Sequence, residues 1–178
     1  MDFSKAGTVT INQSGMIEEI IRTPGIDMLT KTAGATEDKP KTPCHDLLFH
    51  ISDDSPPLDP SLSKTVHSKT AKILFVANRG RLYLLPFISF MTKQVLHPTH
   101  EDGRKLLRAL QYLAHTSKLD LTLGYVGTPT ISVYIDAPFG VHQDRKSHTG
   151  VLPRSGGEHC IRSRPPRKST RPPPAKRS

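Results

Sequence analysis

The stretch from Thr99 to Asp136 constrains the fold most, because its hydrophobic spacing changes from that of a helix to that of a strand. Behind Thr99, apolar residues recur three and four positions apart, at Leu106, Ala109, Leu110 and Leu113. This is the spacing of one buried helix face. Thr99 with Asp102 three residues later is typical of a helix start in which the two residues cap each other. We therefore expect a helix from Thr99 whose solvent side carries Arg104, Lys105, Arg108 and Gln111.

Two short segments after this helix alternate apolar and polar residues, which is the pattern of strands with one buried face. The first runs from Leu119 to Tyr125 and the second from Ile131 to Asp136, with a turn at Gly127-Thr128-Pro129 between them. We expect the two to pair with each other as antiparallel strands. A helix followed by such a pair predicts the α+β class.

The earlier part of the chain predicts further short elements separated by helix breakers. Residues 1–13 predict a hairpin that turns at Lys5-Ala6-Gly7, and Ser14 is a candidate cap for a short helix that Pro24-Gly25 ends. Residues 24–62 are rich in proline and predict an irregular linker. Apolar spacing then predicts a helix over 63–77, broken at 78–80, and another over 84–93 with Pro86 in its first turn.

The composition changes abruptly after Gly150. From Pro153 to Ser178 the chain carries eight basic residues and one acidic residue, so most of its formal net charge of +9 lies there. Such a segment has too little apolar surface to offset chain entropy and is predicted to be disordered. A basic tail attracts nucleic acid weakly and electrostatically, which makes nucleic acid a candidate partner.

A motif at the end of the second predicted strand gives a family resemblance. The run YIDAPFGVHQDRKSHTG, residues 134–150, is similar to the segment that opens the ribonuclease H of Copia-type retrotransposon Pol polyproteins. Residues 97–124 resemble the stretch just before it, and residues 1–21 resemble the strand and helix after the polymerase catalytic loop. Residues 69–96 resemble the intervening helices, although Leu82 and Tyr83 follow Arg81 where the family usually has Pro-Asp.

The resemblance implies a division of the chain into five parts. Residues 1–23 would be the end of the reverse transcriptase palm or the start of a thumb-like piece, 24–62 a linker, and 63–115 a helical connection region. Residues 116–152 would begin an incomplete ribonuclease H-like sheet, and 153–178 would be the disordered Arg/Pro-rich tail. The expected architecture is an α+β fragment with an N-terminal hairpin and short helix, a Pro-rich linker, two to three helices and a two-strand antiparallel pair.

Asp136 is the one candidate catalytic residue. In the family this position is the first nuclease carboxylate, which binds two Mg²⁺ ions together with several other carboxylates. The later glutamate and aspartate of that site have no counterpart here, since Glu158 has no helical context. One carboxylate cannot hold a pair of divalent ions. Asp136 is therefore interpreted as vestigial, and a frameshift just after Leu152 would explain where the family-like sequence stops.

Other residues that could carry chemistry are interpreted as structural. Asp53-Asp54 follows Ser52 in a proline-flanked loop and does not match the polymerase Tyr-x-Asp-Asp pattern, so it is read as a solvated acidic pair. Cys44-His45 and His50 have no second ligand pair at zinc-finger spacing. We expect no cofactor and no metal site, although the intact parent would use Mg²⁺.

These observations predict a non-catalytic remnant of a Copia-type reverse transcriptase/ribonuclease H polyprotein, and not an enzyme. The alternative is a small basic nucleic-acid-binding or adaptor protein that acts through residues 153–178. A working nuclease is a third hypothesis, in which Asp136→Asn would abolish Mg²⁺-dependent cleavage of an RNA–DNA hybrid.

The sequence also predicts a compartment. Two distant cysteines, Cys44 and Cys160, and a start without an apolar signal segment predict an intracellular protein, cytoplasmic or nuclear, that is not secreted. Arg79 and Arg81 interrupt the most apolar stretch, which argues against a membrane span.

Overall fold

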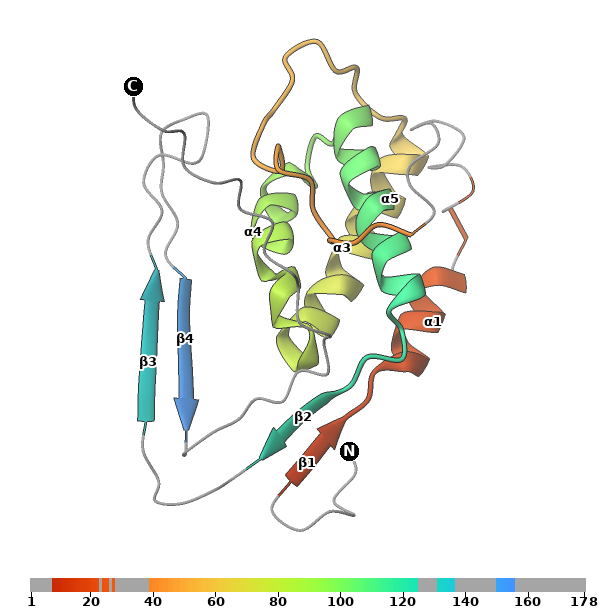
Figure 1. Cartoon of the computed structure of the whole chain (residues 1–178). Helices are drawn as coiled ribbons and strands as arrows, with labels where there is room; N and C mark the ends of the chain where they lie inside the picture. Colours follow the sequence, from red (N-terminus) through yellow and green to blue (C-terminus); the bar gives the residue numbers. More distant parts are fainter. Residues whose placement is uncertain are drawn as a thin grey trace, which may run out of the picture.

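The computed structural model describes residues 8–22, 24–25, 27, 39–124, 131–136 and 150–155, which are coloured in Figure 1. The helices are α1 Ser14–Arg22, α3 Pro60–Gly80, α4 Leu85–Gln94 and α5 His100–His115, with a 3-10 turn at Leu82–Leu84 before α4. The strands are β1 Thr8–Ile11, β2 Leu121–Gly124, β3 Ile131–Asp136 and β4 Gly150–Ser155. The mixture of helices with small antiparallel sheets agrees with the predicted α+β class.

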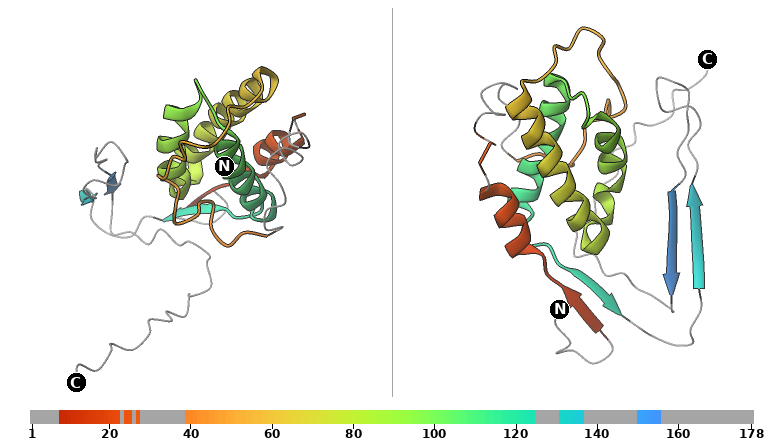
Figure 2. Two further views of the ribbon diagram at one scale, coloured as in Figure 1. Left: turned by 90° about the horizontal axis from the view of Figure 1, so that it is seen from above. Right: turned by 180° about the vertical axis from the view of Figure 1, so that it is seen from behind.

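The four helices share one hydrophobic core. α3 contacts each of the other three helices, as Figures 1 and 2 show from several sides. Every helix contributes side chains with no exposed surface, namely Ile17 and Ile20, Val66, Ile73 and Val76, Phe87 and Met91, and Leu106 and Leu113. Burying side chains of this size stabilises a fold by about 1.5–3 kcal/mol each. The described helices therefore hold one another together through this shared core.

α3 is longer at both ends than the predicted 63–77. Pro60 fits the first turn, where an amide N–H would have no helical partner. Asn78 and Arg79, predicted to break the helix, form its last turn, and the Arg81 N–H then donates to the carbonyl of Val76 at 3.3 Å. The predicted helix end was wrong because the buried Val76 and Ala77 anchor that last turn against the core.

The other helices follow the sequence signals closely. α4 starts and ends one residue later than predicted, with Pro86 in its first turn. At the start of α5 the predicted capping box is confirmed: the Thr99 N–H donates to Asp102 Oδ2 at 2.9 Å, and the Asp102 N–H donates to Thr99 Oγ1 at 3.5 Å. α1 differs in one detail, because Ser14 is its first residue and donates its N–H to the Asn12 side chain at 3.0 Å. Asn12, and not Ser14, supplies the cap.

The pairing of β1 and β2 differs from the prediction. β1 pairs antiparallel with β2, with Thr8 opposite Gly124 and Ile11 opposite Leu121. The expected pairing of 119–125 with 131–136 is therefore wrong. The register is supported by polar contacts, a 3.2 Å hydroxyl pair between Thr10 and Thr122 and a 2.6 Å bond between Asn12 and Asp120, which apolar alternation does not reveal. Residues 1–7, the other half of the predicted N-terminal hairpin, lie outside the described residues.

β3 pairs instead with β4, a strand that the sequence did not predict. Ile131 lies opposite Ser155, and Asp136 lies opposite Gly150. The expectation that disorder begins at Pro153 is wrong at its start, because β4 continues through Pro153 to Ser155. Each strand of a two-stranded sheet has one unpaired edge, where a proline is tolerated because no partner needs its missing N–H. Residues 156–178 lie outside the described residues.

Residues 39–59, within the predicted linker, pack against the helices without forming a helix or strand of their own. Leu48 and Leu58 are buried, and the Phe49 ring meets the Phe90 ring edge to face, with centroids 6.1 Å apart. The Leu58 N–H donates to the carbonyl of Pro98 at 2.9 Å. This segment therefore covers part of the helical core, and it lies beside the start of α5.

None of the described helices combines the length and the apolar character that crossing a bilayer requires.

Candidate functional site

Asp136, the predicted catalytic position, is the last residue of β3 and lies opposite the first residue of β4, Gly150. The motif of residues 134–150 thus begins in one strand and ends in the strand paired with it. Its intervening residues, 137–149, lie outside the described part of the chain. Within the described part, no three His, Cys, Asp or Glu side chains gather closely enough to hold a metal ion.

The acidic pair Asp53-Asp54 is exposed in a turn. This agrees with its interpretation as a solvated pair. Both residues lie in the segment before α3 that packs beside the start of α5.

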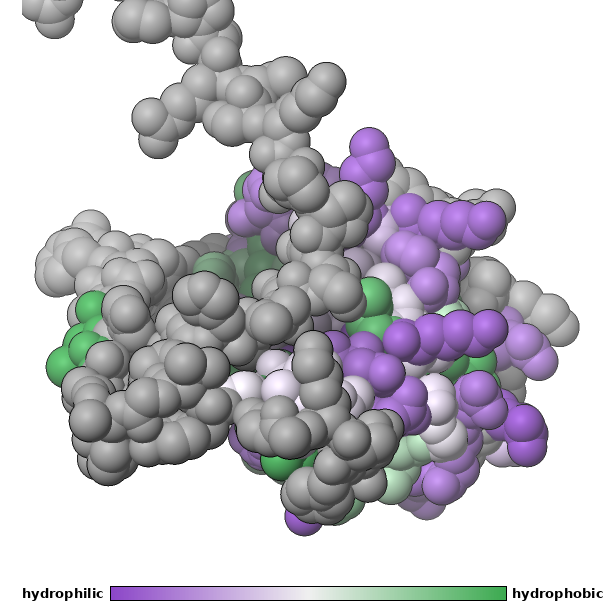
Figure 3. All heavy atoms as spheres, turned by 60° about the horizontal axis from the view of Figure 1, so that its bottom comes forward, coloured by the Kyte–Doolittle hydropathy of each residue, from purple (hydrophilic) through white to green (hydrophobic). Residues whose placement is uncertain are grey.

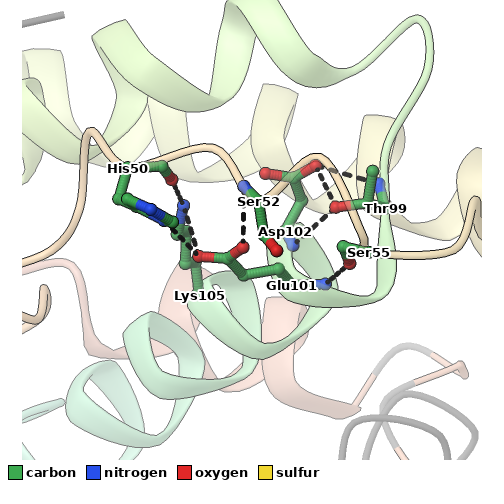
Figure 4. Close-up of polar contacts among 7 residues, drawn as sticks. All are labelled: His50, Ser52, Ser55, Thr99, Glu101, Asp102 and Lys105. Carbon is green, nitrogen blue, oxygen red and sulfur yellow. Dashed lines mark hydrogen bonds and ion pairs between the residues drawn. The ribbon is translucent and has the colours of Figure 1, made fainter. Parts of the chain in front are cut away.

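A polar cluster ties residues 50–55 to the first turns of α5 (Figure 4). Glu101 is its centre: its Oε2 accepts from the Ser52 N–H at 3.2 Å, and its Oε1 lies 3.1 Å from Lys105 Nζ and 3.9 Å from His50 Nδ1. The Glu101 N–H donates to Ser55 Oγ at 3.1 Å, and Lys105 Nζ donates to the His50 carbonyl. We call this cluster the α5 clamp, because it joins an irregular segment to a helix terminus.

The α5 clamp contains a histidine, a carboxylate and two serines, so it invites comparison with a nucleophile and its base. In Figure 4 the His50 ring is directed at Glu101. Among the described residues no hydrogen bond joins His50 to the hydroxyl of Ser52 or Ser55, and Ser55 Oγ accepts from the Glu101 backbone. A catalytic serine needs its base within about 2.6–3.2 Å. The contacts that the clamp does make join residues 50–55 to the first turns of α5.

Two adjoining hollows open next to the clamp, between residues 39–48 and α5. The first, of about 420 Å³, has an apolar wall of Leu47, Leu48 and Phe87 and also touches Glu101, Arg104 and Lys105. The second, of about 440 Å³, is lined by Lys39, Lys41, Thr42 and Asp46. Cys44, His45 and Arg108 line both. We call the pair the basic hollow, because its lysines and arginines outnumber its carboxylates.

The positively charged side chains of the basic hollow differ in the hydrogen bonds and ion pairs that they make. Arg108 donates to Thr42 Oγ1 at 3.4 Å, and Lys105 lies 4.4 Å from the centre of the Phe90 ring besides pairing with Glu101. Lys39, Lys41 and Arg104 are exposed, and among the described residues their side chains make no hydrogen bond or ion pair. Three cations are thus available to a ligand.

Cys44 lies where the two hollows meet. Burial raises the pKa of its thiol to about 11, and the nearby positive charge of Arg108 opposes that rise. Because the thiolate is the nucleophilic form, a thiol that stays protonated at neutral pH is a poor nucleophile. Cys44 therefore serves as a lining residue of the hollow.

Sequence reasoning missed the role of Arg81. The sequence predicted a helix break at 78–80 and gave Arg81 no structural role, but only 2% of Arg81 is exposed. Its Nη2 donates to the carbonyls of Thr116 and Ser117 at 2.8 and 3.0 Å, and its Nη1 donates to Tyr83 Oη at 3.0 Å. Arg79, two residues earlier, is exposed and stacks 3.6 Å above the Phe75 ring. Only the family pattern, which has an arginine at this position, set Arg81 apart from Arg79.

The basic hollow was also missed, because its residues come from the predicted linker and from the solvent side of the predicted helix. The signal in the sequence was the cluster of Arg104, Lys105 and Arg108 on one face of α5. No protein-family model, curated protein or solved structure matches this chain.

Proposed function

We propose that this chain is a non-catalytic segment of a Copia-type retrotransposon Pol polyprotein, from the region that connects the reverse transcriptase to its ribonuclease H. The observation that carries the proposal is the position of the 134–150 motif. Its Asp136 ends one strand and its Gly150 begins the antiparallel partner. A strand end is where a two-metal nuclease presents its first carboxylate. On this proposal β3 and β4, and not residues 119–125, correspond to the first two strands of the nuclease sheet.

The helical part supports a connecting role. α3, α4 and α5 share a core, and Arg81 joins the start of α4 to the residues that follow α5. The polar clusters described above hold segments together: the α5 clamp fixes residues 50–55, and the capping box fixes the helix start. A rigid helical unit of this kind can set the spacing between two larger domains.

The absence of independent catalysis follows from the number of carboxylates. A two-metal nuclease surrounds ions roughly 4 Å apart with several acidic side chains. Asp136 is the one residue in this sequence that matches the metal-binding carboxylates of the family's nuclease site. A single carboxylate leaves most ligand positions of two divalent ions unfilled.

An RNA–DNA hybrid with Mg²⁺ tests the proposal directly. The purified full chain and Asp136→Asn are expected to show equal, background-level cleavage. Cleavage by the unsubstituted chain that Asp136→Asn abolishes would contradict the non-catalytic assignment. The origin is tested separately by the genomic sequence on both sides of the reading frame. We expect a polymerase Tyr-x-Asp-Asp motif upstream and a Ser-Thr-Glu-Ala-Glu-like motif downstream, and the absence of both in every frame would sink the family assignment.

The alternative, a nucleic-acid-binding or adaptor protein acting through residues 153–178, is favoured by the concentration of basic residues there. It predicts that affinity for single-stranded RNA falls steeply between 50 and 200 mM salt, by a factor on the order of 300 for six phosphate contacts. Deleting residues 156–178, which leaves β4 intact, would then abolish binding. Weak binding that survives this deletion excludes the tail as the functional part.

A further inference from the structure

The basic hollow has an apolar lining on one side and a positively charged lining on the other. Neither the proposed connecting role nor the α5 clamp accounts for this combination. One half is lined by leucine and phenylalanine, and the other by lysine. We propose that it binds a small amphipathic anion, in which one phosphate or carboxylate head is joined to an acyl or aromatic body. Each of its two halves lies within the range of about 300–1,000 Å³ that is usual for small-molecule sites.

The head would lie among the exposed cations. Lys41 and Lys39 line the polar half, Arg104 lines the apolar half, and Arg108 stands at the junction of the two. An arginine guanidinium can donate two parallel hydrogen bonds to a phosphate or carboxylate, and lysines add point charges. The two carboxylates that oppose this charge are unequal, because Glu101 is paired with Lys105 while Asp46 is exposed.

The apolar body would lie mainly against Leu47, because Leu48 and Phe87 have almost no exposed surface. Leu48 and Phe87 belong to the hydrophobic core, but 64% of Leu47 is exposed at the edge of the hollow. Covering such a side chain with an apolar ligand gains about 25 cal/mol for each Å² removed from water. Leu47 is thus the residue that the proposed ligand would bury most.

The wall that carries these residues is already held in place. Thr42 Oγ1 donates to the Cys44 carbonyl at 2.8 Å and accepts from Arg108, and the α5 clamp fixes the chain a few residues later. A preformed site avoids the cost of ordering a loop when the ligand binds.

The lining favours a small anion over a nucleic acid strand. Proteins that bind single strands offer exposed aromatic rings on which bases stack. Among the described lining residues Phe87 is fully buried, so His45 is the one exposed ring on which a base could stack. A single ring gives less stacking surface than the row of rings on which a strand lays successive bases.

Calorimetric titration of the full chain tests the site with four probes of one chain length, each below its micelle concentration: decanoate, decyl phosphate, decyltrimethylammonium and decanol. We expect the two anions to bind at least tenfold more tightly than the cation or the alcohol, and their ratio identifies the preferred head. In Lys41→Gln/Arg104→Gln the anion affinity should fall at least fivefold. In the matched control Arg79→Gln/Lys93→Gln, which removes two exposed cations elsewhere, it should not change.

A second measurement reports binding at the hollow itself. In a Cys160→Ser background at alkaline pH, where part of the Cys44 thiol is ionised, saturating decanoate or decyl phosphate should slow alkylation of Cys44 by iodoacetamide at least fivefold, because Cys44 lines both halves. Equal affinity for anions and cation, equal loss in the control pair, or no protection of Cys44 would overturn the proposal. So would an oligonucleotide that binds through Lys41 and Arg104 where neither anion does.

Discussion

The helical unit, which consists of α1, α3, α4 and α5 with residues 39–59, differs from the β3–β4 pair in how far it buries its apolar side chains. Ile73 of α3 has no exposed surface, whereas 69% of Ile135 and 53% of Val133 on β3 are exposed. Figure 3 shows hydrophobic spheres uncovered at the left edge, on the side where β3 lies in Figure 1. The apolar faces of the helices cover one another and form a core. A strand with alternating residues has one apolar face, and that face is buried only when another element packs on it.

This difference has a physical consequence for stability. A two-stranded antiparallel pair is marginal by itself, and its open edges are available to other strands. The helical unit gains its stability from side chains contributed by all four helices and by residues 39–59. We therefore expect the two regions to respond very differently to matched substitutions.

The largest expected difference comes from the two isoleucines. Ile73→Ala should lower the free energy of unfolding by about 3–4 kcal/mol, because it removes buried methylene groups and leaves a cavity. Ile135→Ala should change it by less than about 0.5 kcal/mol, as is usual for exposed positions. Urea denaturation followed by the helical circular dichroism signal measures both. Equal losses would mean that β3 is buried in solution, and the contrast between the two regions would disappear.

Arg81 tests whether polar burial matters as much as apolar burial in the helical unit. Arg81→Met keeps most of the side-chain volume but removes three hydrogen bonds from a charged group, two of them to backbone carbonyls. We expect a loss of about 3 kcal/mol, since two part-buried carbonyls and a phenol oxygen lose a charged donor. Arg79→Met, two residues away and exposed, is the control and should cost less than about 0.5 kcal/mol. The same denaturation measurement compares the two substitutions. Equal losses in Arg81→Met and Arg79→Met would show that the hydrogen bonds of Arg81 do not stabilise the core.

Cys44 makes the stability of the helical unit depend on pH in the alkaline range. It lies in residues 39–59, the part of this unit that forms no helix or strand. Its pKa rises from 9.0 to about 11 on folding, so between these values the unfolded chain loses the thiol proton first. Stability from this group is complete below pH 9 and is lost as the pH rises through 11, by about 2 kcal/mol after allowance for partial exposure. Cys44→Ala should remove that part of the decline. An unchanged alkaline profile in the variant would show that the thiol is solvated in the folded state.

The part of the fold that depends on local spacing was predictable. α5 and its capping box follow from a threonine, an aspartate and four regularly spaced apolar residues, and α4 follows from a proline that fits a first turn. Strand partners were not predictable, because alternation at β2 and β3 is equally compatible with several neighbours. The observed partner of β2 is β1, and that of β3 is β4. The β1–β2 pairing is supported by contacts between residues far apart in the sequence, such as Thr10 with Thr122.

The candidate sites divide in the same way. The location of Asp136 at a strand end could be read from the sequence, since the position depends only on where alternation stops. The basic hollow could not, because it requires residues 39–48 to fold back onto α5 across about sixty intervening positions. Arg81 was hidden for a related reason: its acceptors, the carbonyls of Thr116 and Ser117, have no sequence signature at all.

The smallest effect expected here separates the two regions most cleanly. Thr99→Ala removes one side of the capping box and should lower the free energy of unfolding by about 1 kcal/mol. Thr92→Ala, which removes an exposed hydroxyl bonded within α4, is the control. Because the cap acts on the first turn of α5, amide hydrogen exchange should speed up at Asp102 and its neighbours in Thr99→Ala, and at Val133 it should not change. Faster exchange in β3 as well would show that α5 and the β3–β4 pair unfold together, and the two regions would then be one cooperative unit.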